Sequence, residues 1–296
     1  MFSGVIPALL TPLSDQDLVD TGALRDLVES LLGRGVDGFY VCGSTGEGLL
    51  LTEEERCQVV DAVVSQVRSR VPVIVHVGAP ATSVSQRLAR HAREAGADAV
   101  ASIPPIYYAV GRAEIETHYR RIAEVCGLPL YLYNLPNATQ VSLEGRLICD
   151  LVKDGIAQGL KYTSYDQLNF REVIEFCGDA INVLAGPDEM LLPFLVMGAH
   201  GGIGTTYNLV PELFVDLYAA WAAGEIQKAQ QLQYQIDRII LVVRKFGVIP
   251  AVKAALRLRG LDCGGPRAPL LPLSPEAVDQ LACELDQVGV LALGRV

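Results

Sequence analysis

Eight short apolar segments alternate along the chain with segments of helical period, and this alternation restricts the fold more than any other feature. Near-continuous apolar segments, each followed by a helix, are typical of parallel strands buried on both faces. Eight such units in roughly 220 residues favour a (βα)8, or TIM, barrel over an open doubly wound sheet. No GxGxxG motif follows the first segment, which weakens a dinucleotide-binding fold. The segments are residues 4–10, 38–42, 73–77, 97–102, 130–134, 158–161, 181–186 and 201–205.

Helix start and stop signals occur between these segments. Thr52 to Glu55 form a capping box, in which the Thr52 hydroxyl accepts the Glu55 amide and the Glu55 carboxylate accepts the Thr52 amide. Residues 83–86 have the same form and predict a second capped helix, which ends at Gly96. Beyond about residue 225 the strand-like segments stop. We therefore expect a barrel over residues 1–224 and a helical extension over residues 225–296 that packs on it.

Composition excludes several classes of protein. A net charge of −10 argues against a nucleic-acid partner, because phosphate binding needs a clustered basic surface. An uninterrupted apolar run long enough to cross a membrane is absent, and residues 1–7 lack the pattern of a signal peptide. The seven cysteines show no CxxC spacing, so we expect them to be reduced in a cytoplasmic protein.

Lys161 lies inside a strand-like segment, whereas nearly all other lysines lie in segments that look exposed or helical. An ammonium surrounded by apolar groups loses hydration, which favours its neutral form. A neutral lysine is the nucleophile that Schiff-base chemistry on a ketone requires. Alternatively, Lys161 is an ordinary strand-end lysine whose ammonium reaches water.

Polar residues at the ends of the neighbouring strands support the first interpretation, because barrel enzymes carry their catalytic groups there. Tyr133 ends the preceding strand, so its phenol and the Lys161 ammonium can meet in the barrel mouth and exchange protons. Thr163 lies two residues after Lys161 and faces the same side. The alternative for Tyr133 is a core aromatic with its hydroxyl satisfied.

Other strand ends carry further candidates. Ser44 and Thr45 lie between glycines, where backbone amides and hydroxyls can cradle a carboxylate, although such residues are also common in ordinary turns. A proline-rich loop presents Tyr107. Asp188 and Glu189 follow the seventh strand, where acidic residues also suit a helix start.

The sequence requires neither a metal nor a cofactor. His76 has no carboxylate at metal-ligand spacing, so a satisfied core histidine is the favoured interpretation. The sequence contains no HExxH motif and no zinc cluster.

Three ordered motifs resemble those of the pyruvate-dependent class I aldolases, the family of dihydrodipicolinate synthase and N-acetylneuraminate lyase. They are Gly43–Glu47, Tyr133–Pro136 and Gly159–Lys161, and the resemblance covers essentially the whole chain. The resemblance implies a (βα)8 barrel that assembles as a homotetramer, a dimer of dimers. It also implies that no cofactor is needed beyond the covalent Schiff base with pyruvate.

The resemblance further implies roles for single residues. Lys161 would form the Schiff base, Tyr133 would be the acid/base group, and Ser44 and Thr45 would hold the pyruvate carboxylate. Tyr107 occupies the position of a tyrosine donated across a subunit interface.

Within the family, several positions resemble the N-acetylneuraminate lyase branch. Ala138 stands where dihydrodipicolinate synthases carry a carboxylate-binding arginine. In the lyases, positions at the ends of the sixth, seventh and eighth strands bind the hydroxyl-rich tail of the sugar. The matching residues here are Thr163, Gly186, Asp188, Glu189, Ile203 and Thr205.

Three hypotheses remain open. The first is a lyase that cleaves a 2-keto-3-deoxy sugar acid, foremost N-acetylneuraminate, to pyruvate and an aldehyde. The second is a 2-keto-3-deoxygluconate-type aldolase or dehydratase, which residues 137–139 resemble, or an enzyme like dihydrodipicolinate synthase. The third is a barrel that binds a keto acid without turnover.

Overall fold

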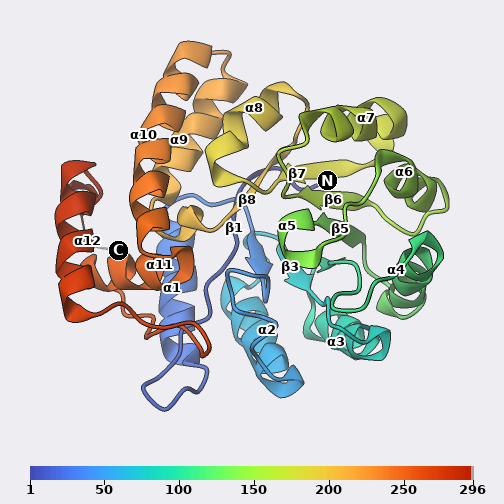
Figure 1. Ribbon diagram of the computed structural model, residues 1–296, viewed down its shortest axis with the longest axis horizontal. Helices are drawn as coiled ribbons and strands as arrows, with labels where there is room; N and C mark the ends of the chain where they lie inside the picture. Colours follow the sequence, from blue (N-terminus) through green and yellow to red (C-terminus); the bar gives the residue numbers. More distant parts are fainter. Residues whose placement is uncertain (295–296) are drawn as a thin grey trace.

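Eight parallel strands form the centre of the molecule, and helices surround them in the computed structural model, which describes residues 1–294 (Figure 1). Each of the eight segments expected from the sequence coincides with one strand, although β6 runs one residue beyond its segment, so the predicted (βα)8 barrel is confirmed. The strands are β1 (Gly4–Pro7), β2 (Phe39–Val41), β3 (Val73–His76), β4 (Ala99–Ser102), β5 (Leu130–Asn134), β6 (Gly159–Tyr162), β7 (Asn182–Ala185) and β8 (Gly201–Gly204).

The strand order closes the sheet into a barrel. Each strand pairs with its neighbour in sequence from β2 to β8, and β8 pairs with β1. A parallel bridge between Ala8 and Tyr40 connects the ends of β1 and β2. Because the strands are parallel, their carboxyl ends lie on one rim, where side chains from different strands meet.

The helices that follow the strands cover the outside of the barrel, and their apolar faces form a second buried layer around it. They are α1 (Thr21–Gly33), α2 (Glu53–Val67), α3 (Thr82–Ala95), α4 (Arg112–Cys126), α5 (Pro136–Thr139), α6 (Gly145–Lys153), α7 (Gln167–Cys177), α8 (Leu191–Val196) and α9 (Pro211–Ala222). Short 3-10 turns, η1 (Gly178–Ala180), η2 (Asp188–Met190) and η3 (Thr206–Asn208), lie near the strand ends.

One of the two predicted capping boxes is present. Thr52 and Glu55 exchange both hydrogen bonds at the start of α2, as expected. The second prediction is wrong, because α3 begins two residues earlier than its pattern indicated. Ala81 is the N-cap there and Ser83 already lies in the first turn, so no side chain caps this helix. Gly96 ends α3 in the left-handed conformation, with φ of 91°.

The expectation that every cysteine is reduced is wrong for one pair. Cys149 on α6 and Cys177 on α7 form a disulfide, with their Cα atoms 5.6 Å apart. The two helices pack side by side, so residues 28 positions apart in the sequence become neighbours. Sequence spacing carries no sign of this packing, because the pair has no CxxC pattern.

Three helices follow the barrel: α10 (Ile226–Lys245), α11 (Val248–Leu258) and α12 (Pro275–Gln287), with a final turn η4 (Leu291–Leu293). Helix α10 packs against α9, and α11 and α12 pack against α10 at one side of the barrel (Figure 1). None of the helices within residues 1–294 combines the length and apolar character needed to cross a bilayer.

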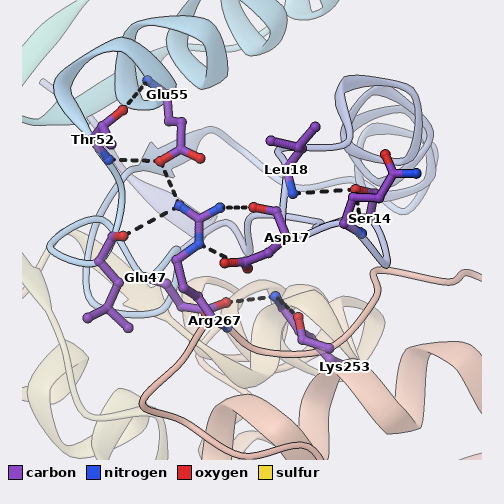
Figure 2. Close-up of polar contacts among 11 residues, drawn as sticks. Ser14, Asp17, Leu18, Glu47, Thr52, Glu55, Lys253 and Arg267 are labelled. Carbon is purple, nitrogen blue, oxygen red and sulfur yellow. Dashed lines mark hydrogen bonds and ion pairs between the residues drawn. The ribbon is translucent and has the colours of Figure 1, made fainter.

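Ion pairs, one of them fully buried, connect these helices and the loop between α11 and α12 to the barrel. The Lys253 ammonium on α11 lies 2.7 Å from the Glu47 carboxylate in the loop after β2, and both side chains are almost fully buried. Glu47 also accepts the backbone amide of Arg267 at 2.6 Å. Figure 2 shows the Arg267 guanidinium between Asp17 and Glu55, with which it pairs. The loops after β1 and β2 are therefore tied to the C-terminal helices.

Candidate active site

Lys161 lies inside the barrel, where only 4% of the residue is exposed. In the register of β5 and β6 it stands directly beside Tyr133. Its Nζ lies 4.4 Å from the centroid of the Tyr133 ring and 4.2 Å from that of Tyr40. Aromatic faces attract an ammonium, so the two rings hold the nitrogen in place, and no carboxylate among residues 1–294 forms an ion pair with it. The predicted meeting of Lys161 and Tyr133 is thus present in the structure.

Tyr40 is a site residue that the sequence reasoning missed. It is fully buried in β2, and its ring meets that of Tyr133 edge-on at 5.9 Å. Burial raises the pKa of Tyr40 well above its usual value, so the phenol stays protonated. The period-two pattern of β2 could have revealed it, because Tyr40 shares an interior row with Ile74 of β3.

His76 is a satisfied core histidine, as expected. Its Nδ1 lies 3.1 Å from the Cys42 carbonyl, and the Ile103 amide donates to its Nε2 at 3.4 Å. Burial, together with the nearby Arg56 guanidinium, lowers the pKa of His76 well below its usual value. A neutral ring that donates through Nδ1 and accepts through Nε2 fits this environment. Within residues 1–294, no group of three His, Cys, Asp or Glu side chains is arranged to hold a metal ion.

The loop after β2 carries the predicted hydroxyl pair. Ser44 is exposed, whereas Thr45 is buried and its Oγ1 lies 2.6 Å from the Thr205 Oγ1 at the end of β8. A Cβ at Gly48 would lie 1.9 Å from the Cys42 carbonyl oxygen, so only glycine permits this tight turn. The turn brings the two hydroxyls to the same rim as Lys161, where they can contact a small anion.

Asp188, in η2 after β7, organises the neighbouring loop after β8. Its carboxylate accepts the Thr205 amide at 3.2 Å, the Thr206 amide at 2.7 Å and the Thr206 hydroxyl at 2.6 Å. Burial raises the pKa of Asp188 to about 6, against the opposing effect of the Thr206 hydrogen bonds. Because both carboxylate oxygens already have protein partners, Asp188 shapes the site more than it offers free acceptors.

A cavity of about 230 Å³ lies among the loops after β5, β6, β7 and β8 and helix α10. Its wall includes five of the predicted substrate-binding residues, Thr163, Gly186, Asp188, Glu189 and Thr205. Lys161, Tyr133, Ser44 and Thr45 do not line this cavity, and Ile203 belongs to the apolar barrel interior.

Thr163 and Gly186 fit closely in the wall of this cavity. A Cβ at Gly186 would lie 1.8 Å from the Thr163 Oγ1, so a larger residue would displace this hydroxyl. Among residues 1–294, the buried Thr163 Oγ1 has no hydrogen-bond partner. A buried hydroxyl without a partner is costly unless a ligand or water satisfies it, which points to a binding role.

Glu189 has two partners that the sequence reasoning missed. The Tyr165 hydroxyl donates to its Oε1 at 2.5 Å, and the Arg244 guanidinium donates to the same oxygen at 3.3 Å. Arg244 lies on α10, 55 residues further along the chain. The rule that the functional groups of a barrel lie at its strand ends does not predict Arg244 near the cavity, because its position depends on how α10 packs on the barrel.

Tyr107 is not brought to the other site residues within one chain. It lies in the loop between β4 and α4, where its side chain is 91% exposed and its φ is 77°. Its ring contacts that of Tyr108, with centroids 5.0 Å apart. An exposed aromatic pair on a constrained loop is available to another molecule, so its expected role across a subunit interface stays a prediction.

Comparisons with known proteins point to one family. The model of the dihydrodipicolinate synthetase family matches residues 1–288. The N-acetylneuraminate lyase of Rhizobium meliloti (strain 1021) is 41% identical over 266 residues, which cover 90% of this chain and 88% of that protein. The 4-hydroxy-tetrahydrodipicolinate synthase of Methanopyrus kandleri is 36% identical over 295 residues, 98% of each chain.

Solved structures extend the likeness to the fold. YagE, a prophage protein of the dihydrodipicolinic acid synthase family from E. coli K12, was solved in complex with pyruvate. It superposes with a TM-score of 0.93 at 28% identity, over 98% of this chain and 99% of that one. Lyases and synthases thus have similar sequence identity to this chain. The similarity therefore identifies the family but does not distinguish between acceptor aldehydes.

Proposed function

Because the chain belongs to the dihydrodipicolinate synthetase family and is a pyruvate-dependent class I aldolase or lyase, we propose that it cleaves 2-keto-3-deoxy sugar acids. The products would be pyruvate and an aldehyde, and N-acetylneuraminate is the first candidate substrate. The observation that carries the proposal is the Lys161 nitrogen, held between two tyrosine rings beside a cavity rich in hydroxyl groups. The 41% identity with a N-acetylneuraminate lyase favours this substrate.

The chemistry starts at Lys161. Its neutral amine attacks the C2 ketone of the substrate, and loss of water gives an iminium ion. Tyr133 takes the proton of the C4 hydroxyl while the bond between C3 and C4 breaks, and the bonding electrons move into the iminium. The resulting enamine gains a proton at C3, and water then hydrolyses the iminium and releases pyruvate.

Two other groups support this cycle. Ser44 and Thr45 hold the pyruvate carboxylate, where hydroxyls and the turn's backbone amides offer donors to an anion. Tyr107 reaches the site of a second copy within a homotetramer, and there it relays protons with Tyr133. The exposure of Tyr107 in the single chain supports this arrangement.

The acceptor end of the substrate lies in the cavity. Thr163, Thr205 and Glu189 offer hydroxyl and carboxylate groups, which suit a polyhydroxylated chain. Ala138 is exposed in α5 and offers no cation for a semialdehyde carboxylate, which speaks against dihydrodipicolinate synthesis.

A second candidate is an aldolase or dehydratase for 2-keto-3-deoxygluconate or a related sugar acid. Asn137 lines the cavity, and an amide there suits a shorter hydroxylated substrate as well. Pyruvate release from N-acetylneuraminate and from 2-keto-3-deoxygluconate, measured side by side, separates the two candidates.

The decisive experiment for the Schiff base is incubation with pyruvate and borohydride, followed by mass spectrometry of the peptides. Lys161 should carry a reduced pyruvate adduct, and a Lys161→Arg variant should carry none. A folded wild-type protein whose Lys161 stays unmodified would refute the covalent mechanism. A labelled protein that releases no pyruvate from any sugar acid would instead support a keto-acid-binding barrel.

A further inference from the structure

Glu189, Tyr165 and Arg244 form a polar group at the edge of the cavity that the chemistry above does not explain. Tyr165 comes from the loop after β6, Glu189 from η2 and Arg244 from the last turn of α10. Both hydrogen bonds, at 2.5 and 3.3 Å, end on the same oxygen of Glu189, Oε1. Among residues 1–294, no protein group donates to the other oxygen, Oε2.

This arrangement limits the movement of the Glu189 side chain. A free glutamate side chain samples many rotamers, and each contact that fixes it costs conformational entropy. Two donors from different elements hold Oε1, which limits the rotation of the carboxylate. Burial raises the pKa of Tyr165 to about 12, and the adjacent Glu189 contributes to this shift, so the phenol keeps its proton. The Tyr165 phenol therefore remains a donor to Oε1 over the physiological pH range.

The charges in the cavity wall indicate which ligands fit. Asp188, Glu189 and Arg244 are the charged residues that line it. Arg244 compensates Glu189, while Asp188 is bound by backbone amides and a hydroxyl, which carry no net charge. The wall thus keeps an excess negative charge when both carboxyl groups are ionised. A second carboxylate on the substrate would be repelled, whereas a neutral hydroxyl can donate to Oε2.

We infer that Arg244 and Tyr165 are positioning residues that hold Glu189 so that its free oxygen accepts a hydroxyl group of the substrate. Through Glu189 they select acceptors with an uncharged polyhydroxylated chain over acceptors that end in a carboxylate. This inference rests on the proposed lyase function and refines the choice of its substrate. Arg244 and Tyr165 are themselves about half exposed, so their contacts with Glu189 contribute little to folding stability.

The test measures aldol addition of pyruvate to three aldehydes: N-acetylmannosamine, succinic semialdehyde and acetaldehyde. The variants are Arg244→Gln, Arg244→Lys, Tyr165→Phe and Glu189→Gln. Lys245→Gln is the matched control, because it removes a neighbouring exposed cation that pairs with Glu284 and not with the cavity. Every variant is also labelled with pyruvate and borohydride, which reports the Schiff base separately from acceptor binding.

We expect Arg244→Gln and Tyr165→Phe to raise the KM for N-acetylmannosamine by about tenfold, the scale of one hydrogen bond to a charged group, with kcat nearly unchanged. Acetaldehyde is too short to contact Glu189, so its KM should stay constant. Arg244→Lys should restore part of the loss. In the Glu189→Gln background, Arg244→Gln should add little, since both changes act through one carboxylate.

Other outcomes overturn the inference. Equal losses for acetaldehyde and N-acetylmannosamine would show a general structural role. Wild-type preference for succinic semialdehyde, lost in Arg244→Gln, would show that Arg244 binds a substrate carboxylate. If the wild-type protein forms no adduct with pyruvate, the proposed function itself fails. If adducts form in every variant while acceptor selectivity stays the same, only the role of Arg244 and Tyr165 is wrong.

Discussion

Gly186 shows how a single atom can change the shape of the acceptor cavity. A Cβ there would lie 1.8 Å from the Thr163 Oγ1, so Gly186→Ala must displace that hydroxyl. We expect KM for the sugar acid to rise by about tenfold, since one polar contact is lost. Steady-state kinetics with N-acetylneuraminate measure this change. Gly33→Ala is the control, because that helical glycine has no atom within 4 Å of an added Cβ; equal kinetics for the two variants would contradict the proposed contact.

A second prediction at this scale concerns Asp188 and pH. Burial raises its pKa from 3.8 to about 6, so between these values the folded protein binds more protons than the unfolded chain. The contribution of Asp188 to the free energy of unfolding is therefore greatest below pH 4. It decreases by up to about 3 kcal/mol as pH rises through 6. Asp188→Asn does not titrate and should escape this loss. Urea unfolding at pH 4 to 7 should show the difference between the two proteins shifting in favour of the variant.

The control for this experiment is a carboxyl group with ordinary exposure. Asp279→Asn is a suitable choice, since Asp279 is exposed on α12 and forms no salt bridge among residues 1–294. If the stability difference between wild type and Asp188→Asn were constant across this pH range, the buried carboxyl would titrate alike in the folded and unfolded states. That result would show that protonation of Asp188 is not coupled to folding.

Between elements, the buried pair of Glu47 and Lys253 connects the loop after β2 to α11. Glu47→Gln would leave the Lys253 ammonium buried, with the Gly265 carbonyl as its remaining close acceptor. Removing one partner of such a pair typically costs about 3 to 5 kcal/mol. We expect a loss of this size in urea unfolding, and weaker pyruvate labelling because Glu47 lies two residues from Thr45.

The matched control is Glu29→Gln. Glu29 pairs with Arg70 at the surface, where 44% of its side chain is exposed, so water screens the pair and we expect a much smaller loss than for Glu47→Gln. Similar losses for Glu47→Gln and Glu29→Gln would mean that water reaches the buried pair. The loop would then be held by its own turn and not by the C-terminal helices.

Elements defined by local pattern were predictable, and contacts between distant elements were not. All eight strands could be predicted, because each lies in a near-continuous apolar segment, the pattern of a parallel strand buried on both faces. The meeting of Lys161 and Tyr133 follows from strand order and register. By contrast, the bond between Cys149 and Cys177 and the contact of Arg244 with Glu189 depend on how separate helices pack. A single sequence contains no periodic pattern or motif from which such helix packing could be predicted.

At the scale of the whole molecule, the barrel gathers groups from five strands at one rim. The loop after β2 brings Thr45, the loop after β8 brings Thr205, and the two hydroxyls meet at 2.6 Å. Thr205 in turn donates its amide to Asp188 after β7. A continuous polar path therefore joins the proposed carboxylate cradle to the wall of the acceptor cavity, so a change at one end is expected to affect the other.

Tyr107 is the one proposed catalytic group that a single chain leaves at the surface. If it completes the site of a neighbouring copy, two inactive variants should complement each other. Lys161→Arg lacks the nucleophile and Tyr107→Phe lacks the phenol, but a mixed dimer holds one site with both groups intact. Random exchange of subunits would then restore up to roughly a quarter of the wild-type rate, because half of the dimers are mixed and each has one working site.

The measurement is pyruvate release after the two variants are unfolded and refolded together, with each variant refolded alone as the control. Complementation requires Tyr107 to act across the interface, since a phenol that served its own chain would leave every site of the mixed dimer defective. An additive rate, equal to the mean of the two variants, would place the role of Tyr107 within one chain. It would then require the exposed loop between β4 and α4 to fold over its own barrel mouth.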